Sequence, residues 1–177
     1  MTQTLTITSA STLLVGGALT ATVSTTASMS SGGGFSYSII NGSGSATIDP
    51  NTGYITGVGA GTVTLVVNAA GDTNYNSTSV SQLITVNKVT PTLTITSANS
   101  LLVDGTLTAT VTSSATFGRG GNITYSIVAG SGSASVNPNT GLVRGVSIGT
   151  VTLTATSAGD TNYYSASTSQ LITIGKL

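Results

Sequence analysis

Few residues in this chain could do chemistry, and the aspartates come first. Asp72 and Asp160 occupy matching positions in two GDTNY segments, an arrangement that raises the possibility of a calcium ligand. Calcium binds about 6–8 oxygen atoms, usually from several carboxylates, and no second acid lies near either aspartate in the sequence. We therefore favour an Asx turn, in which the side chain accepts hydrogen bonds from loop amides. Asp49 is matched by Asn137, which keeps a turn-forming oxygen but loses the charge, and this disfavours a metal or acid role.

Other catalytic arrangements are also disfavoured. The chain has no histidine and no cysteine, so it lacks the base or nucleophile of the common catalytic triads. Glycoside hydrolysis needs paired carboxylates across a cleft, and the four acids are scattered. The glycine-rich residues 31–34 precede a predicted strand, whereas a phosphate-binding loop leads into a helix. We predict a protein that is not an enzyme and that has no catalytic, cofactor-binding or metal-binding residues.

The low charge excludes several classes of partner. Only 5% of the 177 residues are charged, against about 25% in an average soluble protein. Four scattered cations cannot form the basic stripe that neutralises nucleic-acid phosphates or attracts anionic lipid. No apolar run approaches the length of about 18 residues that a membrane helix needs. We therefore predict no nucleic-acid partner and no membrane insertion.

An internal repeat organises the chain. DPNTGYITGVGAGTVTL at residues 49–65 returns as NPNTGLVRGVSIGTVTL at residues 137–153. Leu93 aligns with Leu5 and Tyr125 with Tyr37, so the offset is 88 residues (93 minus 5) and needs no insertion. Such a period indicates tandem structural units. We predict two modules, residues 1–88 and residues 89–177, joined by a short linker whose Pro91 favours extended backbone.

Each module is predicted to be all-β. Residues 62–67 alternate between polar and apolar types, the pattern of a half-buried strand, and Asp, Asn, Pro and Gly mark the turns. We expect a first strand that runs on from residues 5–7 through residues 13–15, and a last strand at residues 82–86. Seven or so short strands of this kind predict a sandwich of two antiparallel sheets.

These residues resemble the bacterial immunoglobulin-like domains, the BIG type, which occur in tandem on bacterial surfaces and in phage virion proteins. The most specific part is Ile48-Asp49-Pro50-Asn51-Thr52-Gly53 with the following Gly57-Val58 and Gly61-Thr62, and its counterpart at residues 136–150. The two GDTNY loops and the Val86-Asn87-Lys88 ending resemble the same group. The resemblance implies two tandem immunoglobulin-like β-sandwich domains that act as spacers, adhesive modules or virion decorations. It carries no catalytic residues over.

Candidate contact residues lie in the loops. The loop of residues 24–34 differs most from its counterpart, with Ser28-Met29-Ser30 standing against Thr116-Phe117-Gly118-Arg119. Phe117 and Arg119 are of types enriched in interface hot spots, and loops on a rigid sandwich commonly carry recognition. Tyr164, which replaces Asn76, is a third candidate for a partner contact.

Two further aromatic and hydroxyl patterns have structural explanations. Tyr75 and Tyr163 are expected to lay their rings over the end of the core, with the hydroxyl bonded locally. The Thr-x-Thr pairs, such as Thr62/Thr64, suggest a hydroxyl array for ice or glycan, but alternation on a strand explains them better. A carbohydrate-binding module would usually show an exposed aromatic platform, and the absence of tryptophan argues against one.

Sheet edges are usually guarded by Lys or Pro, and here charges are almost absent. We expect a neighbouring module, a capsid or a cell-wall partner to cover an edge, and the uncharged edges also allow a homo-oligomer. The function predicted is a surface-displayed structural or binding module with a protein partner or a host-surface glycan. Met1 without an export signal favours a phage virion protein, a capsid decoration or tail accessory. The alternative is a stalk segment of a bacterial cell-surface adhesin.

Overall fold

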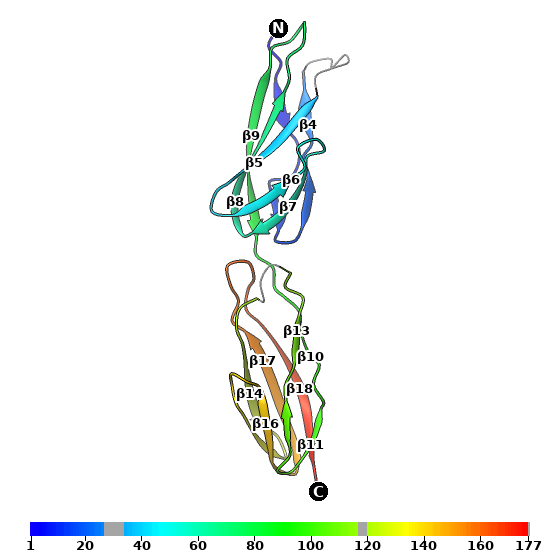
Figure 1. Cartoon of the computed structure of the whole chain (residues 1–177), viewed down its shortest axis with the longest axis vertical. Coiled ribbons are helices and arrows are strands. Elements are labelled where there is room, and N and C mark those ends of the chain that lie inside the picture. Colours follow the sequence, from blue (N-terminus) through cyan, green and yellow to red (C-terminus); the bar gives the residue numbers. More distant parts are fainter. Residues whose placement is uncertain (27–33, 117–119, 177) are drawn as a thin grey trace. The chain divides into compact units, whose positions relative to one another are not determined.

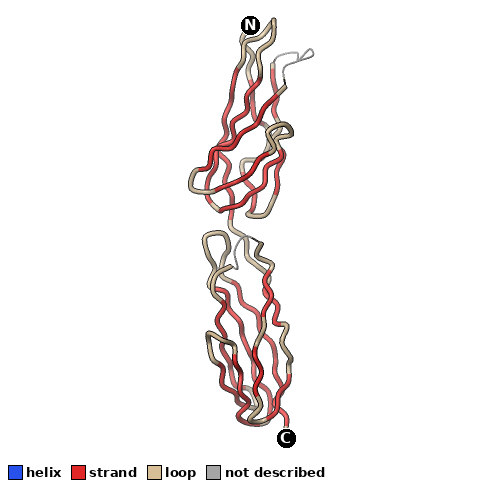
Figure 2. Tube along the Cα trace, in the orientation of Figure 1, coloured by secondary structure: helices blue, strands red, loops and turns tan. Residues whose placement is uncertain are grey.

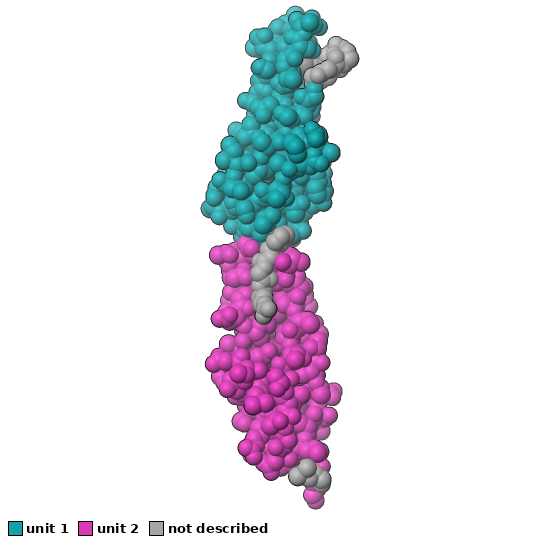
Figure 3. Space-filling view, in the orientation of Figure 1, with its two compact units in different colours: residues 1–89 teal, residues 90–177 magenta. Residues whose placement is uncertain are grey.

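The computed structural model describes residues 1–26, 34–116 and 120–176, and within them every regular element is a strand (Figures 1 and 2). The chain folds into two compact units, Met1–Val89, called unit 1, and Thr90–Leu177, called unit 2 (Figure 3). Among the described residues, no helix has the length and apolar character needed to cross a membrane.

Unit 1 contains two facing sheets. Its four-stranded sheet has the order β2-β9-β8-β5, its three-stranded sheet the order β3-β7-β6, and β1 pairs separately with β4. The strands are β1 (Leu5–Ile7), β2 (Thr12–Leu14), β3 (Ala18–Thr20), β4 (Val23–Thr25), β5 (Phe35–Asn41), β6 (Ser45–Ile48), β7 (Tyr54–Gly59), β8 (Gly61–Ala69) and β9 (Thr78–Asn87).

Unit 2 repeats this topology. Its sheets have the orders β11-β18-β17-β14 and β12-β16-β15, and β10 pairs with β13. The strands are β10 (Leu93–Ile95), β11 (Ser100–Leu102), β12 (Thr106–Thr108), β13 (Val111–Ser113), β14 (Ile123–Ala129), β15 (Ser133–Val136), β16 (Leu142–Ser147), β17 (Gly149–Ser157) and β18 (Ala166–Gly175).

The core of each unit lies between its two sheets. In β8 every second side chain is buried, from Val63 through Leu65 and Val67 to Ala69. Ile55 from the opposite sheet is also fully buried. The corresponding cluster in unit 2 consists of Ala109, Val143, Val151, Leu153, Ile172 and Ile174. Because strand side chains alternate between faces, the threonines between these residues point outward, as the sequence pattern predicts.

Two details of the strand prediction are wrong. The first predicted strand is interrupted, because the chain crosses between sheets: β1 pairs antiparallel with β4, whereas β2 pairs parallel with β9. The sheet containing β2 is therefore mixed rather than antiparallel. The last strand, Thr78–Asn87, is longer than predicted because it pairs with β8 from Thr78 to Val86.

The repeated turn has the geometry that its residue types favour. Gly53 adopts a φ of 70° and Gly141 a φ of 71°, in the left-handed region that glycine enters most easily. A Cβ on Gly53 would lie 3.1 Å from both Ala21 Cβ and Tyr37 Cε1. The turn therefore requires glycine for backbone conformation and for space.

Candidate functional site

The matched aspartates form Asx turns. One carboxylate oxygen of Asp72 accepts hydrogen bonds from the backbone N–H groups of Asn74, at 2.7 Å, and Tyr75, at 2.8 Å. Asp160 makes the same pair with Asn162 and Tyr163. No group of three or more His, Cys, Asp or Glu side chains able to hold a metal occurs in the part of the chain that the structure describes. The geometry matches the turn interpretation.

Asp49 and Asn137 also have equivalent structural roles. Asp49 Oδ1 accepts from the N–H groups of Asn51 and Thr52, at 2.9 and 3.1 Å, and Asn137 Oδ1 accepts from the corresponding residues of unit 2. The backbone hydrogen bond from Asn51 is the main reason that the pKa of the Asp49 carboxyl is lowered, followed by the one from Thr52. The side chain caps a turn.

At one end of unit 2, residues 116, 120 and 122 lie against residues 157–163. Gly159 N–H donates to the Gly120 carbonyl at 2.8 Å, and Ala158 N–H donates to the Asn122 carbonyl at 3.1 Å. The buried Ser157 hydroxyl also donates to the Gly120 carbonyl. Unit 1 has Ala69 at the position of Ser157. Because alanine has no hydroxyl group, the side-chain hydrogen bond of Ser157 has no equivalent in unit 1.

Tyr163 strengthens this contact between the loops. Its side chain is only 3% exposed, and its hydroxyl accepts a hydrogen bond from Thr116 N–H at 2.8 Å. The ring lies in the core as expected, but the hydroxyl bond is to a residue 47 positions away rather than to its own loop. Sequence spacing could not reveal this pairing.

Of the three predicted contact residues, the structure describes Tyr164 and places it at this end of unit 2. Tyr164 is 57% exposed beside buried Tyr163. Phe117 and Arg119 lie outside the described residues, as do Ser28, Met29 and Ser30 of unit 1. Thr116 and Gly120, which flank Phe117 and Arg119, both bond to residues 157–163. The two ends of the predicted variable loop are therefore held at the same end of unit 2 as Tyr164.

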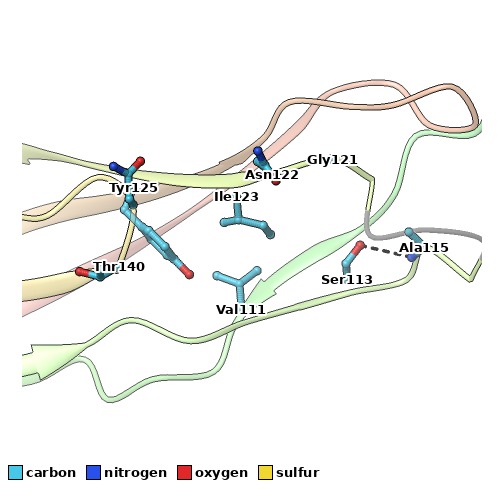
Figure 4. Close-up of a pocket in the computed structure, with 9 residues that line it drawn as sticks. Val111, Ser113, Ala115, Gly121, Asn122, Ile123, Tyr125 and Thr140 are labelled. Carbon is cyan, nitrogen blue, oxygen red and sulfur yellow. Dashed lines mark hydrogen bonds between the residues drawn. The ribbon is translucent and has the colours of Figure 1, made fainter.

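A pocket of about 590 Å³ opens beside these loops (Figure 4). It lies between β13 and β14, and the turn before β16 closes one side. The lining residues are Val111, Ser113, Ala115, Gly121, Asn122, Ile123, Tyr125, Asn139 and Thr140. Sequence reasoning missed it. The sequence feature that could have indicated a pocket is the replacement of Phe35 in the first module by the smaller Ile123 in the second.

The outer face of each four-stranded sheet carries an exposed aliphatic row that was also not predicted. Ile40, Thr64 and Leu83 are directly paired across β5, β8 and β9, and Ile40 and Leu83 are 61% and 60% exposed. The same register in unit 2 holds Val128, Thr152 and Leu171, with Val128 and Leu171 65% and 60% exposed. We call these two sets the aliphatic rows.

The surroundings of the rows are uncharged. The neighbouring paired positions along β8 and β9 are Thr62 with Thr85, and Val66 with Ser81. The edge strands of the sheets, β2, β5, β3 and β6 in unit 1 and β11, β14, β12 and β15 in unit 2, contain no charged residue. The unguarded edges expected from composition are therefore present in the fold, and what covers them is untested.

Comparison with known protein families matches part of the chain. Residues 83–163 match the sequence model of the bacterial Ig-like domain (group 2). The resemblance to bacterial immunoglobulin-like domains is thereby confirmed for this stretch, and the predicted fold class of two tandem immunoglobulin-like β-sandwich domains is confirmed. No curated protein matches the sequence.

The solved structures that match this chain are distant from it in sequence. A fragment of intimin in complex with the translocated intimin receptor is 18% identical, with 97% of this chain and 64% of that chain covered and a TM-score of 0.38. A SusE-like surface located polysaccharide binding protein from Bacteroides thetaiotaomicron is 14% identical, with 98% of this chain and 34% of that chain covered and a TM-score of 0.37. Three N-terminal domains of the Highly Immunogenic Outer Capsid protein of bacteriophage RB49 are 13% identical, with 99% of this chain and 70% of that chain covered and a TM-score of 0.34. The chain thus spans between one third and about two thirds of the length of the first two structures.

Proposed function

We propose, starting from the match of residues 83–163 to the bacterial Ig-like domain family, that this chain is a non-enzymatic structural or binding module displayed on a surface. The specific role proposed is that of a phage virion protein, a capsid decoration or tail accessory. Its partner is then a protein of the capsid or tail, and a host-surface glycan is a further partner class.

The aliphatic rows are the observation that carries this proposal. Single exposed apolar residues are ordinary, but here an equivalent pair recurs at the same register in both units. Each pair lies on a face whose paired neighbours are Thr, Ser and Val. Such a face can be covered without removing water from any charge, which is the costly part of burying a surface. This favours packing against another protein surface.

A virion fits such a face because a capsid or tail presents the same protein surface many times. Two weak contacts made by one chain add through effective concentration, even where each alone is weak. Each aliphatic row then makes a modest contact, and the two contacts together provide the binding strength.

The second candidate is a stalk segment of a bacterial cell-surface adhesin. The favouring observation is the tandem repeat itself, because two copies of one sandwich are connected by a short segment that contains Pro91. Tandem modules serve as spacers in repeat proteins.

The experiment that tests both is mass-spectrometric detection of this chain in purified virions and in cell-envelope fractions of the source culture. Stoichiometric presence in virions supports the virion role. Recovery from the envelope within a longer chain supports the adhesin role. Absence from both fractions contradicts surface display.

Substitution of the rows tests the contact itself. We expect Leu83→Ser with Leu171→Ser to weaken binding to the isolated partner surface by at least about tenfold, which corresponds to about 1.4 kcal/mol. Stability should change by less than about 0.5 kcal/mol per site, as for other exposed positions. The control is Tyr54→Ser with Leu142→Ser, because these residues are similarly exposed but lie on the other sheet. Equal binding by the row variant and the control would contradict a contact at the rows.

The loop residues provide a separate contact test. We expect Phe117→Ala, Arg119→Ala and Tyr164→Ala to reduce partner binding while the thermal unfolding midpoint stays unchanged. Tyr54→Ala is the matched control for Tyr164, because the two side chains are 52% and 57% exposed. Unchanged partner binding by the triple variant would remove these residues from the interface.

A further inference from the structure

We propose that the pocket between β13 and β14 binds a neutral sugar residue. The pocket exists because the sandwich is open on this side: among the described strands, β13 pairs only with β10, and β14 is an edge strand that pairs only with β17. Inward-facing side chains of the two strands therefore remain half-buried instead of closing over one another. Its volume of about 590 Å³ falls within the range of about 300–1,000 Å³ that is usual for small-molecule sites.

The ligand should be uncharged. None of the nine lining residues in the described part of the chain is acidic or basic, so these residues offer no counter-charge to a phosphate, carboxylate or amine. A buried ionic group without such a partner is strongly disfavoured. The described lining therefore favours an uncharged sugar over a charged sugar or a nucleotide.

The lining combines apolar and hydrogen-bonding surfaces in the way that a sugar requires. Val111 and Ile123 face one another across the pocket, and the ring of Tyr125 lies beside them (Figure 4). These side chains can cover the C–H face of a pyranose ring. Hydroxyl groups of Ser113 and Thr140 lie at the border, where they can bond to sugar hydroxyls.

Tyr125 gives the second reason to expect a ligand. Its side chain is half-buried. The Tyr125 hydroxyl points into the pocket (Figure 4), where it can form a hydrogen bond with a ligand hydroxyl.

The first module shows how the chain can fill the same position. Phe35 stands where Ile123 stands, and its ring packs edge-on against Tyr37, with ring centroids 6.5 Å apart. Ile123→Phe therefore introduces a side chain that the repeat already accommodates at the equivalent site. This gives a filling variant with low risk to folding.

The test uses the whole chain labelled with ¹⁵N and titrated with methyl glycosides of glucose, galactose, mannose and N-acetylglucosamine. We expect at least one glycoside to shift the amide signals of Ile123, Tyr125 and Thr140, with a Kd near 1 mM or tighter. Ile123→Phe should weaken that binding at least tenfold. Tyr125→Phe, which keeps the ring and removes only the hydroxyl, should weaken it about threefold to tenfold. Tyr37→Phe is the control and should leave the Kd unchanged.

Several results would overturn the inference. These are the absence of shifts with all four glycosides, equal binding by the Ile123→Phe variant, and binding of a short apolar peptide in place of every sugar. If Ile123→Phe lowers the unfolding midpoint, Tyr125→Phe still decides the matter. The inference rests on the proposed function in that it names a binding site for the glycan partner class. The two can fail separately, because the virion and envelope measurements are made without any sugar.

Discussion

At the residue scale, the chain uses polar side chains chiefly to satisfy its own backbone. Asp49 and Asn137 accept the same two N–H groups although one is charged and the other is not. Asp72 and Asp160 do the same for the loops before the last strands. The oxygen atom is the common requirement, and the charge is incidental to the turn.

The charge nevertheless has a consequence for pH dependence. Hydrogen bonds from Asn51 and Thr52 lower the pKa of the Asp49 carboxyl, so ionised Asp49 stabilises the folded state. This contribution is complete above the unfolded-state pKa of about 3.9 and is lost as the pH falls through the lower folded-state pKa. We expect the difference in urea midpoint between the wild-type chain and Asp49→Asn to shrink below about pH 4. Amide signals of β7 report the unfolding of unit 1, and identical pH profiles for the two proteins would contradict the prediction.

At the element scale, short strands require close approach of the connecting turns. In unit 2 the turn between β11 and β12 packs over β16, where Asp104 N–H donates to the Gly145 carbonyl and Gly145 N–H donates to the Gly105 carbonyl. A Cβ on Gly145 would lie 2.7 Å from the Leu102 carbonyl oxygen. Gly57 holds the same place in unit 1, 2.6 Å from the Leu14 carbonyl oxygen. Glycine at these positions lets the turn lie directly on the strand.

Gly145→Ala should therefore destabilise unit 2. The added methyl group meets backbone rather than a movable side chain, and such overpacking typically costs about 1–3 kcal/mol. Gly175→Ala is the matched control in the same unit, because the nearest atom to its Cβ would be 3.5 Å away, an ordinary contact. Urea unfolding followed at the amide signals of β17 measures both. A loss of stability no larger for Gly145→Ala than for Gly175→Ala would show that the turn can move away.

At the scale of the whole molecule, one sandwich design is used twice with different surfaces. The pairing registers of β8 with β9 and of β17 with β18 correspond residue by residue. Some differences lie in the core, where Val67 corresponds to Ala155 and Val86 to Ile174. Others lie in the pocket position of Phe35 and Ile123, in Tyr164, and in the variable loops. Recognition can therefore differ between the two units while the fold is unchanged.

The proposed module limits, residues 1–88 and residues 89–177, predict autonomous folding. They lie one residue from the boundary between the compact units. We expect each module, expressed alone, to unfold cooperatively and to give amide signals that overlay on those of the whole chain except near the cut. A module that is unfolded when isolated would contradict these limits and would show that the two depend on each other for stability.

The amino-acid sequence by itself determined the all-β class, the repeat and the turns. Alternation in residues 62–67 and the Asp49-to-Gly53 turn are local patterns, and local hydrogen bonds and side-chain direction decide them. Tertiary structure alone decided which strands pair, because β1 and β2 have similar local sequences but belong to different sheets. It also decided that Thr116 meets Tyr163 and that Ile40 aligns with Leu83. The pocket beside Ile123 and the aliphatic rows depend on residues far apart in the chain, and only the packing of the sheets brings those residues together.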